Sequence, residues 1–236
     1  MPPNSSSSFA LVLLGVAACG PAAPQPTANP TGRDVPVYQE PMHRLEFQSP
    51  LVRVLDVRVP AGDTTAYHVH ANRLVGVAVQ DASTWSQVKG APPSAVKPAP
   101  ATPYFFDNWS QTLPYTHRVA NADTVPLHYV GAELLTRSGT DAPAFSDGPN
   151  RRLIKEGPAG RVYQITLAPG QATELHTHAA PGLVVQGNKG VLSDDGHPRA
   201  RGGKGGGSWS WHEAQYRHEL RNDGSTQLIV YEIDWR

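Results

Sequence analysis

Two histidine pairs, each with a single residue between its members, are the feature of this sequence best suited to chemistry. His68 and His70 form the first pair, and His176 and His178 form the second. Alternate residues of a β-strand project from the same face, so the imidazoles of each pair can approach one metal ion. Imidazole nitrogen is a common ligand of zinc, copper, iron and nickel. The pattern therefore indicates one metal site in each half of the chain.

A third histidine follows each pair at a matched place. His117 in the first half and His218 in the second each stand four residues before an asparagine. A strand across the fold could bring this third imidazole to the ion, at the usual Zn–N distance of roughly 2.0–2.1 Å. The predicted ligands are thus His68, His70 and His117 in the first half, and His176, His178 and His218 in the second. The other histidines have no counterpart between the halves: His43, His128, His197 and His212.

The segments around these histidines read as short strands, and they recur in the same order. Residues 51–59 and 161–167 are rich in β-branched or alternating apolar residues, and each runs into a Pro/Gly turn before its histidine pair. Apolar segments at 127–135 and 228–235 close the two halves. The repeat predicts an all-β protein with two tandem units. Their expected bounds are 37–138 and 151–236, with a Ser-, Gly- and Pro-rich linker at 139–150.

The N-terminus reads as an export signal followed by a tether. Residues 1–18 contain a short apolar run, too short to cross a bilayer as a helix, and Cys19 follows small residues at its end. This arrangement is typical of a bacterial lipoprotein, so we expect Cys19 to be lipidated and to hold an exported protein on a membrane, facing the periplasm or the cell surface. An ordinary signal peptide with an incidental cysteine is the alternative. Residues 19–36 are Pro- and Ala-rich and would form the tether.

The charge balance argues against nucleic acid as a partner. The chain has 20 Lys and Arg against 20 Asp and Glu, without a long basic run. Proteins that bind nucleic acid usually carry a basic patch or stripe. A small molecule is the expected partner, besides the membrane.

The two halves resemble the cupin superfamily at both of its signature motifs. The first motif, Gly-x5-His-x-His, is matched by Gly62 to His70 and by Gly170 to His178, and the second ends in His-x3-Asn. The resemblance implies two tandem antiparallel jelly-roll barrels, a bicupin, and allows two protomers to pair as many cupins do. Metal-binding cupins usually have a glutamate four or five residues after the second histidine. That position holds Leu74 or Val75 in one copy and Gly182 or Leu183 in the other, so we expect sites of three histidines without a carboxylate.

Three neutral imidazoles leave the full 2+ charge on a bound ion. Such a site suits Fe, Ni, Cu or Zn and favours a small anionic chelating ligand. The resemblance implies a metal-dependent dioxygenase, in which the histidines hold the ion and the open positions take substrate and oxygen. A non-catalytic module that captures a metal or small molecule at the cell surface is the alternative, and a third interpretation is a structural lipoprotein whose histidines no longer bind metal. The sequence identifies no catalytic acid or base.

Overall fold

The protein is almost entirely β-structure. The structure is a computed structural model that describes residues 34–100, 104–140, 143–145, 148–195 and 206–236. These residues form strands and one short 3-10 helix, η1 (Val37–Gln39). None of their helices is long and apolar enough to cross a membrane. Cys19, His197, the predicted signal peptide and the tether up to residue 33 lie outside the described residues.

The strands fall into two groups along the chain, separated by the predicted linker. The first unit contains β1 (Val35–Pro36), β2 (His43–Gln48), β3 (Val52–Val59), β4 (His68–His70), β5 (Arg73–Gln80), β6 (Thr84–Val88), β7 (Phe105–Asp107), β8 (Tyr115–Asn121) and β9 (Leu127–Leu134). The second unit contains β10 (Arg151–Gly157), β11 (Gly160–Leu167), β12 (His176–His178), β13 (Gly182–Gln186), β14 (Leu192–Asp194), β15 (Trp209–His212), β16 (Tyr216–His218), β17 (Leu220–Asn222) and β18 (Leu228–Trp235).

Each unit has a five-stranded sheet and, facing it, the strands that carry the histidines. The five-stranded sheets have matching orders, β2-β3-β9-β5-β7 and β10-β11-β18-β13-β15. The facing strands form β1-β4-β8-β6 in the first unit and the pairs β12-β16 and β14-β17 in the second. These sheets are hydrogen-bonded separately, so each unit is an open jelly roll. The predicted all-β jelly-roll fold is confirmed, and β1 adds the last two residues of the predicted tether to the first unit by pairing with His68 and Val69.

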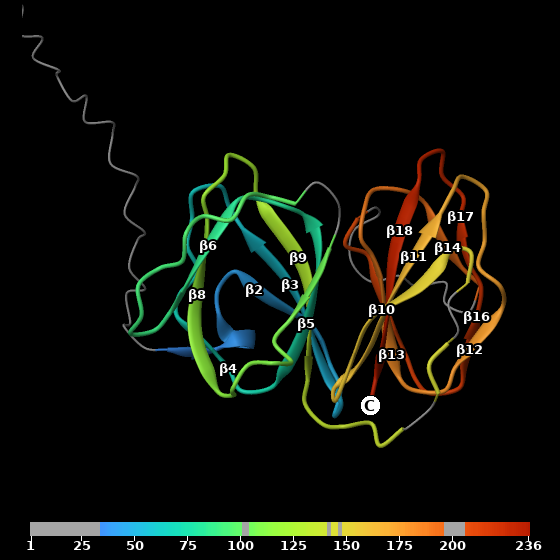
Figure 1. Ribbon diagram of the computed structural model, residues 1–236, viewed down its shortest axis with the longest axis horizontal. Helices are drawn as coiled ribbons and strands as arrows, with labels where there is room; N and C mark the ends of the chain where they lie inside the picture. The colour runs from blue at the N-terminus through green and yellow to red at the C-terminus, as the bar shows by residue number, and fades with distance from the viewer. Residues whose placement is uncertain (1–33, 101–103, 141–142, 146–147, 196–205) are drawn as a thin grey trace, which may run out of the picture.

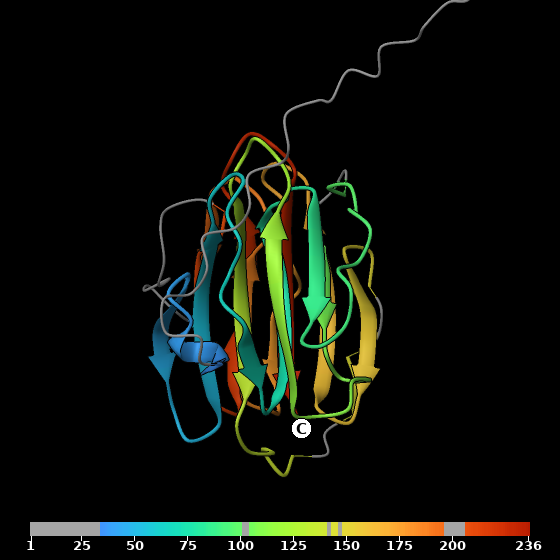
Figure 2. The same cartoon turned by 90° about the vertical axis from the view of Figure 1, so that its left-hand side faces the viewer.

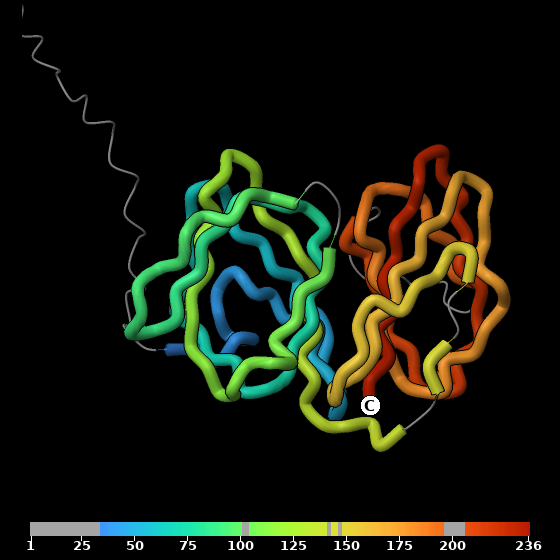
Figure 3. The backbone as a smooth tube through the Cα atoms, viewed as in Figure 1, coloured from blue at the N-terminus to red at the C-terminus, as the bar shows by residue number. Residues whose placement is uncertain are grey.

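The two five-stranded sheets pack against each other and bury a shared core. In Figures 1 and 3 they meet at the centre of the molecule, and the C-terminus lies at this junction. Figure 2, turned by 90°, views the molecule from the side of the first unit, and most strands run up and down the picture. Tyr231, Ile233 and Trp235 of β18 pack in one cluster with Val52 and Val130 of the first unit. Since side chains alternate along a strand, the residues between them face the interior of the second unit.

A hydrogen-bonded cluster around the buried Asp56 lies where the two units meet. The His128 Nε2 atom donates a hydrogen bond of 2.6 Å to Asp56, whose other oxygen accepts one of 3.0 Å from Arg58. A Cβ at Gly207 of the second unit would lie 2.6 Å from the His128 ring, and Gly207 has a φ of 89°, so glycine suits this contact on both counts. Burial raises the pKa of Asp56, but the hydrogen bonds from His128 and Arg58 outweigh it and lower the pKa to about 2.

Replacing Asp56 with asparagine should remove an acid-sensitive part of the stability. The pKa of Asp56 falls from 3.8 to about 2 on folding, so its contribution is fully present above pH 3.8 and is lost as the pH falls through about 2. Urea unfolding across this range should show the gap between wild type and Asp56→Asn closing towards low pH. The exposed Asp63→Asn serves as the control. A gap that stays constant with pH would contradict the assignment.

Candidate metal centres

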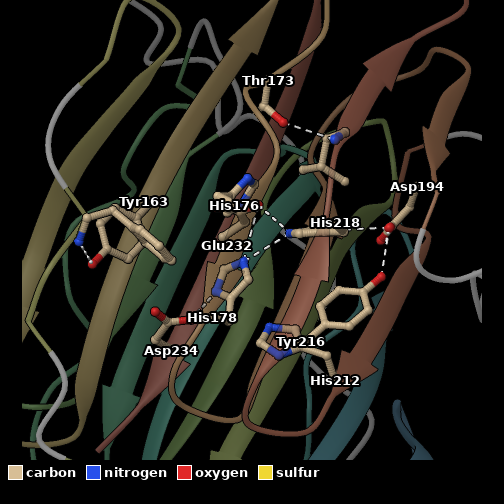
Figure 4. A network of polar contacts seen from close by, with 12 residues as sticks. Tyr163, Thr173, His176, His178, Asp194, His212, Tyr216, His218, Glu232 and Asp234 are labelled. Carbon is tan, nitrogen blue, oxygen red and sulfur yellow. Dashed lines mark hydrogen bonds and ion pairs between the residues drawn. The ribbon is translucent and has the colours of Figure 1, made fainter.

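In the second unit the three predicted histidines converge on a single point. His176 and His178 lie on β12, and His218 faces them from β16, where it pairs with His176 in the antiparallel register. The Nε2 atoms of His178 and His218 are 3.0 Å apart. Figure 4 shows these imidazoles turned towards Glu232, and the four residues can place one ligand atom each within 4.8 Å of one another. All of them are buried.

The other ring nitrogen of each of these histidines donates to an oxygen. The Nδ1 atom of His176 donates to the backbone carbonyl of Glu174 at 2.8 Å. His178 donates to Asp234 at 2.7 Å, and His218 donates to Asp194 at 3.1 Å. A hydrogen bond on Nδ1 fixes the orientation of the ring, so Nε2 faces the site and can bind a metal ion once its proton is displaced. The second unit therefore has three imidazoles already oriented as ligands.

Glu232 supplies the carboxylate that the sequence pattern lacked. Its Oε1 atom lies 3.1 Å from the Nε2 atom of His176 and 3.3 Å from that of His218. Burial raises the pKa of Glu232, but hydrogen bonds from the three imidazoles outweigh it and hold the pKa well below its usual range. The expectation that neither unit has a carboxylate is wrong for the second unit. The glutamate comes from the last strand of the unit instead of the position after the second histidine.

The first unit brings its three predicted histidines together as well. Their ligating nitrogens lie within 4.8 Å of one another, and the Nε2 atoms of His70 and His117 are 3.0 Å apart. The Nδ1 atom of His68 donates to the carbonyl of Ala66 at 3.0 Å, but the buried Nδ1 atom of His70 has no hydrogen-bond partner. Burial lowers the pKa values of His68, His70 and His117 to about 4, 2 and 3. These imidazoles are therefore neutral, as metal ligands must be.

The first unit lacks the acidic residues that surround the second site. Gly131 occupies the strand position that matches Glu232, since each lies fourteen residues after the third histidine of its unit. Glu133 matches Asp234 in the same way, but its carboxylate accepts hydrogen bonds from Arg53 at 3.0 Å and from Asn72 at 2.9 Å. It is therefore engaged away from His70. Among the described residues, the first cluster consists of three histidines alone.

The donor sets fit a divalent transition metal. Each unit offers at least three convergent imidazole nitrogens, and the second adds a buried carboxylate. Without an ion, the buried Oε2 atom of Glu232 has no hydrogen-bond partner. Nitrogen and carboxylate ligands of this kind suit Fe, Ni, Cu or Zn.

Comparison with known proteins supports this architecture at the level of fold. No protein-family model matches the sequence, and no curated protein matches it. Solved structures do match, among them AerE from Microcystis aeruginosa, with 12% identity, a TM-score of 0.54, and coverage of 84% of this chain and 98% of that chain. A likeness at this identity shows the fold alone. It agrees with the two histidine motifs, which lie on strands of the jelly rolls. The chain has the cupin fold.

Two further structures match the cupin fold of this chain over most of its length. YhhW from Escherichia coli is 15% identical, with a TM-score of 0.52 over 80% of this chain and 88% of that chain. Salicylate 1,2-dioxygenase from Pseudoaminobacter salicylatoxidans, in adducts with gentisate, is 12% identical, with a TM-score of 0.53 over 79% of this chain and 68% of that chain. These cupin-like neighbours include a dioxygenase, and the histidine clusters of this chain are candidate transition-metal sites.

A cavity of about 180 Å³ adjoins the histidines of the first cupin unit. His70 and His117 form part of its wall, and most of the remaining wall is aromatic or polar. Its other lining side chains include Tyr104, Phe106, Tyr115, Tyr129, Asn108 and Lys97. An engineered apolar cavity of about 150 Å³ holds benzene, so this one has room for a molecule of one small ring. The first site therefore has space for an organic ligand beside its imidazoles.

The second cupin site is covered by an aromatic side chain from the predicted linker. The Phe145 ring centroid lies 5.4 Å from that of His176 and 5.1 Å from that of His178, nearly perpendicular to both. The Tyr163 hydroxyl contacts the backbone nitrogen of Phe145 at 3.1 Å, and the Arg151 guanidinium lies over the ring at 4.6 Å. Phe145 thus shields the imidazoles of the second site. The imidazoles of the first site lie beside a cavity instead.

Two histidines without a counterpart between the halves lie beside the sites. The His43 ring centroid is 4.6 Å from that of His68, and the His212 centroid is 4.4 Å from that of His178. Sequence reasoning missed them because they come from β2 and β15, outside the repeated motifs. It also missed Glu232 and Asp234, for which the sequence does carry a signal. Acidic residues at alternate positions of an otherwise apolar closing strand point to a polar interior on that face.

Proposed function

We propose that this chain is a lipid-anchored bicupin that holds a divalent transition metal in each unit and acts as a metal-dependent dioxygenase on a small anionic chelating substrate. The observation that carries the proposal is the convergence of three imidazole nitrogens in each unit, fully buried in the second and beside a cavity in the first. The two sites differ in openness, so we assign catalysis to the first unit and tight metal retention to the second.

The first site suits an anionic substrate for electrostatic reasons. His68, His70 and His117 are neutral, so a bound ion keeps its full charge and its open positions favour anionic donors such as enolate, carboxylate or thiolate. When bound, the ion supplies Lewis-acid and redox chemistry towards oxygen and the substrate. Lys97 lines the same cavity and offers a positive charge to the substrate. The match to a structure named salicylate 1,2-dioxygenase supports this assignment.

A non-catalytic role in metal binding is the second candidate, and the second unit favours it. Its candidate ligands are buried, and hydrogen-bond contacts join His176 to Glu232 and His178 to His218. Phe145 packs against two of its imidazoles. A closed set of four protein ligands is typical of structural metal sites, whereas catalytic sites keep a position open. Under this alternative the first unit captures a small molecule without converting it.

Metal analysis of the purified chain tests the binding proposal. We expect stoichiometric transition metal in the wild type, lost from the first unit in His68→Ala and from the second unit in His176→Ala, because each substitution removes one of three or four ligands. Elemental analysis of wild type and both variants measures this. Leu175→Ala, at an exposed neighbour of His176, is the control. Metal content unaffected by either histidine substitution would overturn the proposal.

Oxygen uptake separates the enzyme from the binding module. Diketone, thiol and phenolic compounds are the first substrates to test, since each offers an anionic chelating group. Uptake that is lost in His68→Ala but retained in a variant of the second unit supports catalysis in the first unit. Ligand binding without uptake supports the non-catalytic module.

The lipid anchor is proposed from the sequence around Cys19. Acyl chains on Cys19 would hold the two units on a membrane through the Pro- and Ala-rich tether, on the periplasmic or outer face. Cell fractionation of wild type and Cys19→Ala tests this. The proposal predicts that the wild type sediments with membranes and that Cys19→Ala does not.

A further inference from the structure

His212 of the second unit has a ring nitrogen that nothing in the site uses. The residue is 1% exposed, and its Nδ1 atom donates to the carbonyl of Glu213 at 3.1 Å. This hydrogen bond leaves the Nε2 atom as a lone pair, and that atom is buried without a hydrogen-bond partner. Leaving a buried polar atom unsatisfied is costly, so such an atom in a native fold points to a missing partner.

The residue with this unused nitrogen belongs to a second cluster of candidate ligands. His212, His178 and Asp234 can each place one donor atom within 4.8 Å of the other two, and all three residues are buried. The Nδ1 atom of His178 and the Oδ1 atom of Asp234 are already 2.7 Å apart. The cluster lies on the opposite edge of the His178 ring from Glu232, as Figure 4 shows. One imidazole therefore stands between two sets of ligands.

The described residues of the first unit form no such second cluster. Asn108 occupies the position in the first unit that His212 occupies in the second. Asn108 bonds to Leu74, and His212 pairs with Gly182. Leu74 and Gly182 each lie four residues after the second histidine of their unit. The Asn108 side chain accepts from the backbone of Leu74 at 2.7 Å and donates to that of Asn72 at 3.0 Å. Asparagine thus has a complete structural role there. His212 has no such role, since none of the described residues hydrogen-bonds to its Nε2 atom, and it shares a candidate ligand cluster with Asp234.

We propose that the second unit binds two metal ions that share His178. This proposal rests on the metal centre proposed above and adds a neighbour to it. The first ion binds the Nε2 atom of His178 together with His176, His218 and Glu232. The second binds the Nδ1 atom of His178 together with His212 Nε2 and Asp234. Imidazole and carboxylate ligands of this kind suit a zinc or cupric ion, among others.

The charges around the pair of ions balance. The first ion displaces the Nε2 proton of His178, the second displaces the Nδ1 proton that His178 shares with Asp234, and both protons leave to solvent. His178 then carries one negative charge, and Glu232, Asp194 and Asp234 carry one each. Two divalent ions carry four positive charges in total. Buried charges are tolerated only when they are paired in this way.

Copper binding tests the shared histidine. The full chain carrying His68→Ala, which removes the site of the first unit, is loaded with Cu²⁺ and analysed for copper content and for electron paramagnetic resonance. We expect two copper ions per chain. The electron paramagnetic resonance signal should account for less copper than is bound, because an imidazole bridge couples the two spins. Adding His212→Asn introduces the residue type that the first unit has at this position. It should remove one ion and restore a signal that accounts for all the remaining copper.

Controls separate this inference from the proposal beneath it. His43→Asn makes the same exchange at another buried histidine, and we expect it to leave the coupled signal unchanged. His212→Gln is a second variant should the asparagine disturb folding. A single ion that His212→Asn and His212→Gln both retain would overturn the paired site and leave the first metal centre standing. No copper bound at all would overturn both.

Discussion

Replacing Glu232 with glutamine should lower the metal affinity of the second unit by at least about 100-fold. Loss of a hydrogen-bond partner behind a metal ligand typically costs 10–100-fold in affinity, and Glu232 is itself a candidate ligand that lies among three imidazole nitrogens. Glutamine keeps the size of the side chain but removes its charge. The expected loss therefore reports the carboxylate rather than a cavity.

Competition with a chelator of known affinity measures this change. His68→Ala serves as the parent, so that only the second unit contributes. Asp194→Asn is the matched control, because Asp194 accepts hydrogen bonds from His218 Nδ1 and the Tyr216 hydroxyl and is outside the ligand cluster. This substitution should cost about 10–100-fold. Equal affinities for the parent and Glu232→Gln would show that Glu232 is not a ligand.

The metal-free protein provides an independent readout of the same substitution. Burial opposes the charged form of His178, but hydrogen bonds to Asp234 and Glu232 outweigh it and raise its pKa to about 9. Removing one partner of a buried ion pair typically destabilises a protein by roughly 3–5 kcal/mol. Urea unfolding without metal should therefore show a loss for Glu232→Gln, since the positive charge of His178 loses one of its two partners.

The fold and all six candidate histidine ligands follow from local patterns in the sequence. Alternating apolar residues place Tyr163, Ile165 and Leu167 on one face of a strand, and all three are buried. The spacing of His176 and His178 fixes their common face, whatever surrounds them. Such features depend on residues a few positions apart, and a duplicated motif doubles the signal.

The difference between the two sites depends on contacts that the sequence does not display. Glu232 reaches His176 across 56 positions of the chain, through the pairing of β18 with β11 and β13. Glu133 and Asp234 occupy matching positions, yet Arg53 engages one and His178 the other. Which partner a carboxylate takes is set by tertiary packing. The repeat therefore predicted equal sites where the fold has made them unequal.

Placing a glutamate at Gly131 should give the first unit the ligand it lacks. A Cβ at this position would meet side-chain atoms of Tyr129, Leu74 and Leu55 at 3.7–3.9 Å, which is ordinary van der Waals contact. Gly131 pairs with Leu55 and Gly76 on its neighbouring strands. Glu232 pairs in the same way with Tyr163 and Val184. A side chain at position 131 would therefore enter the unit on the histidine side. We expect Gly131→Glu to raise the metal affinity of the first unit on the order of 100-fold.

The same substitution should abolish oxygen uptake, because the carboxylate takes a coordination position and part of the 180 Å³ cavity. Metal titration in a His176→Ala background measures the gain, and oxygen uptake measures the loss. Gly131→Gln fills the same space without a charge, so it should reduce uptake and leave metal affinity unchanged. Tighter metal binding by both variants would mean that packing controls the site. Tighter binding by Gly131→Glu alone would mean that a single missing carboxylate keeps the first unit open.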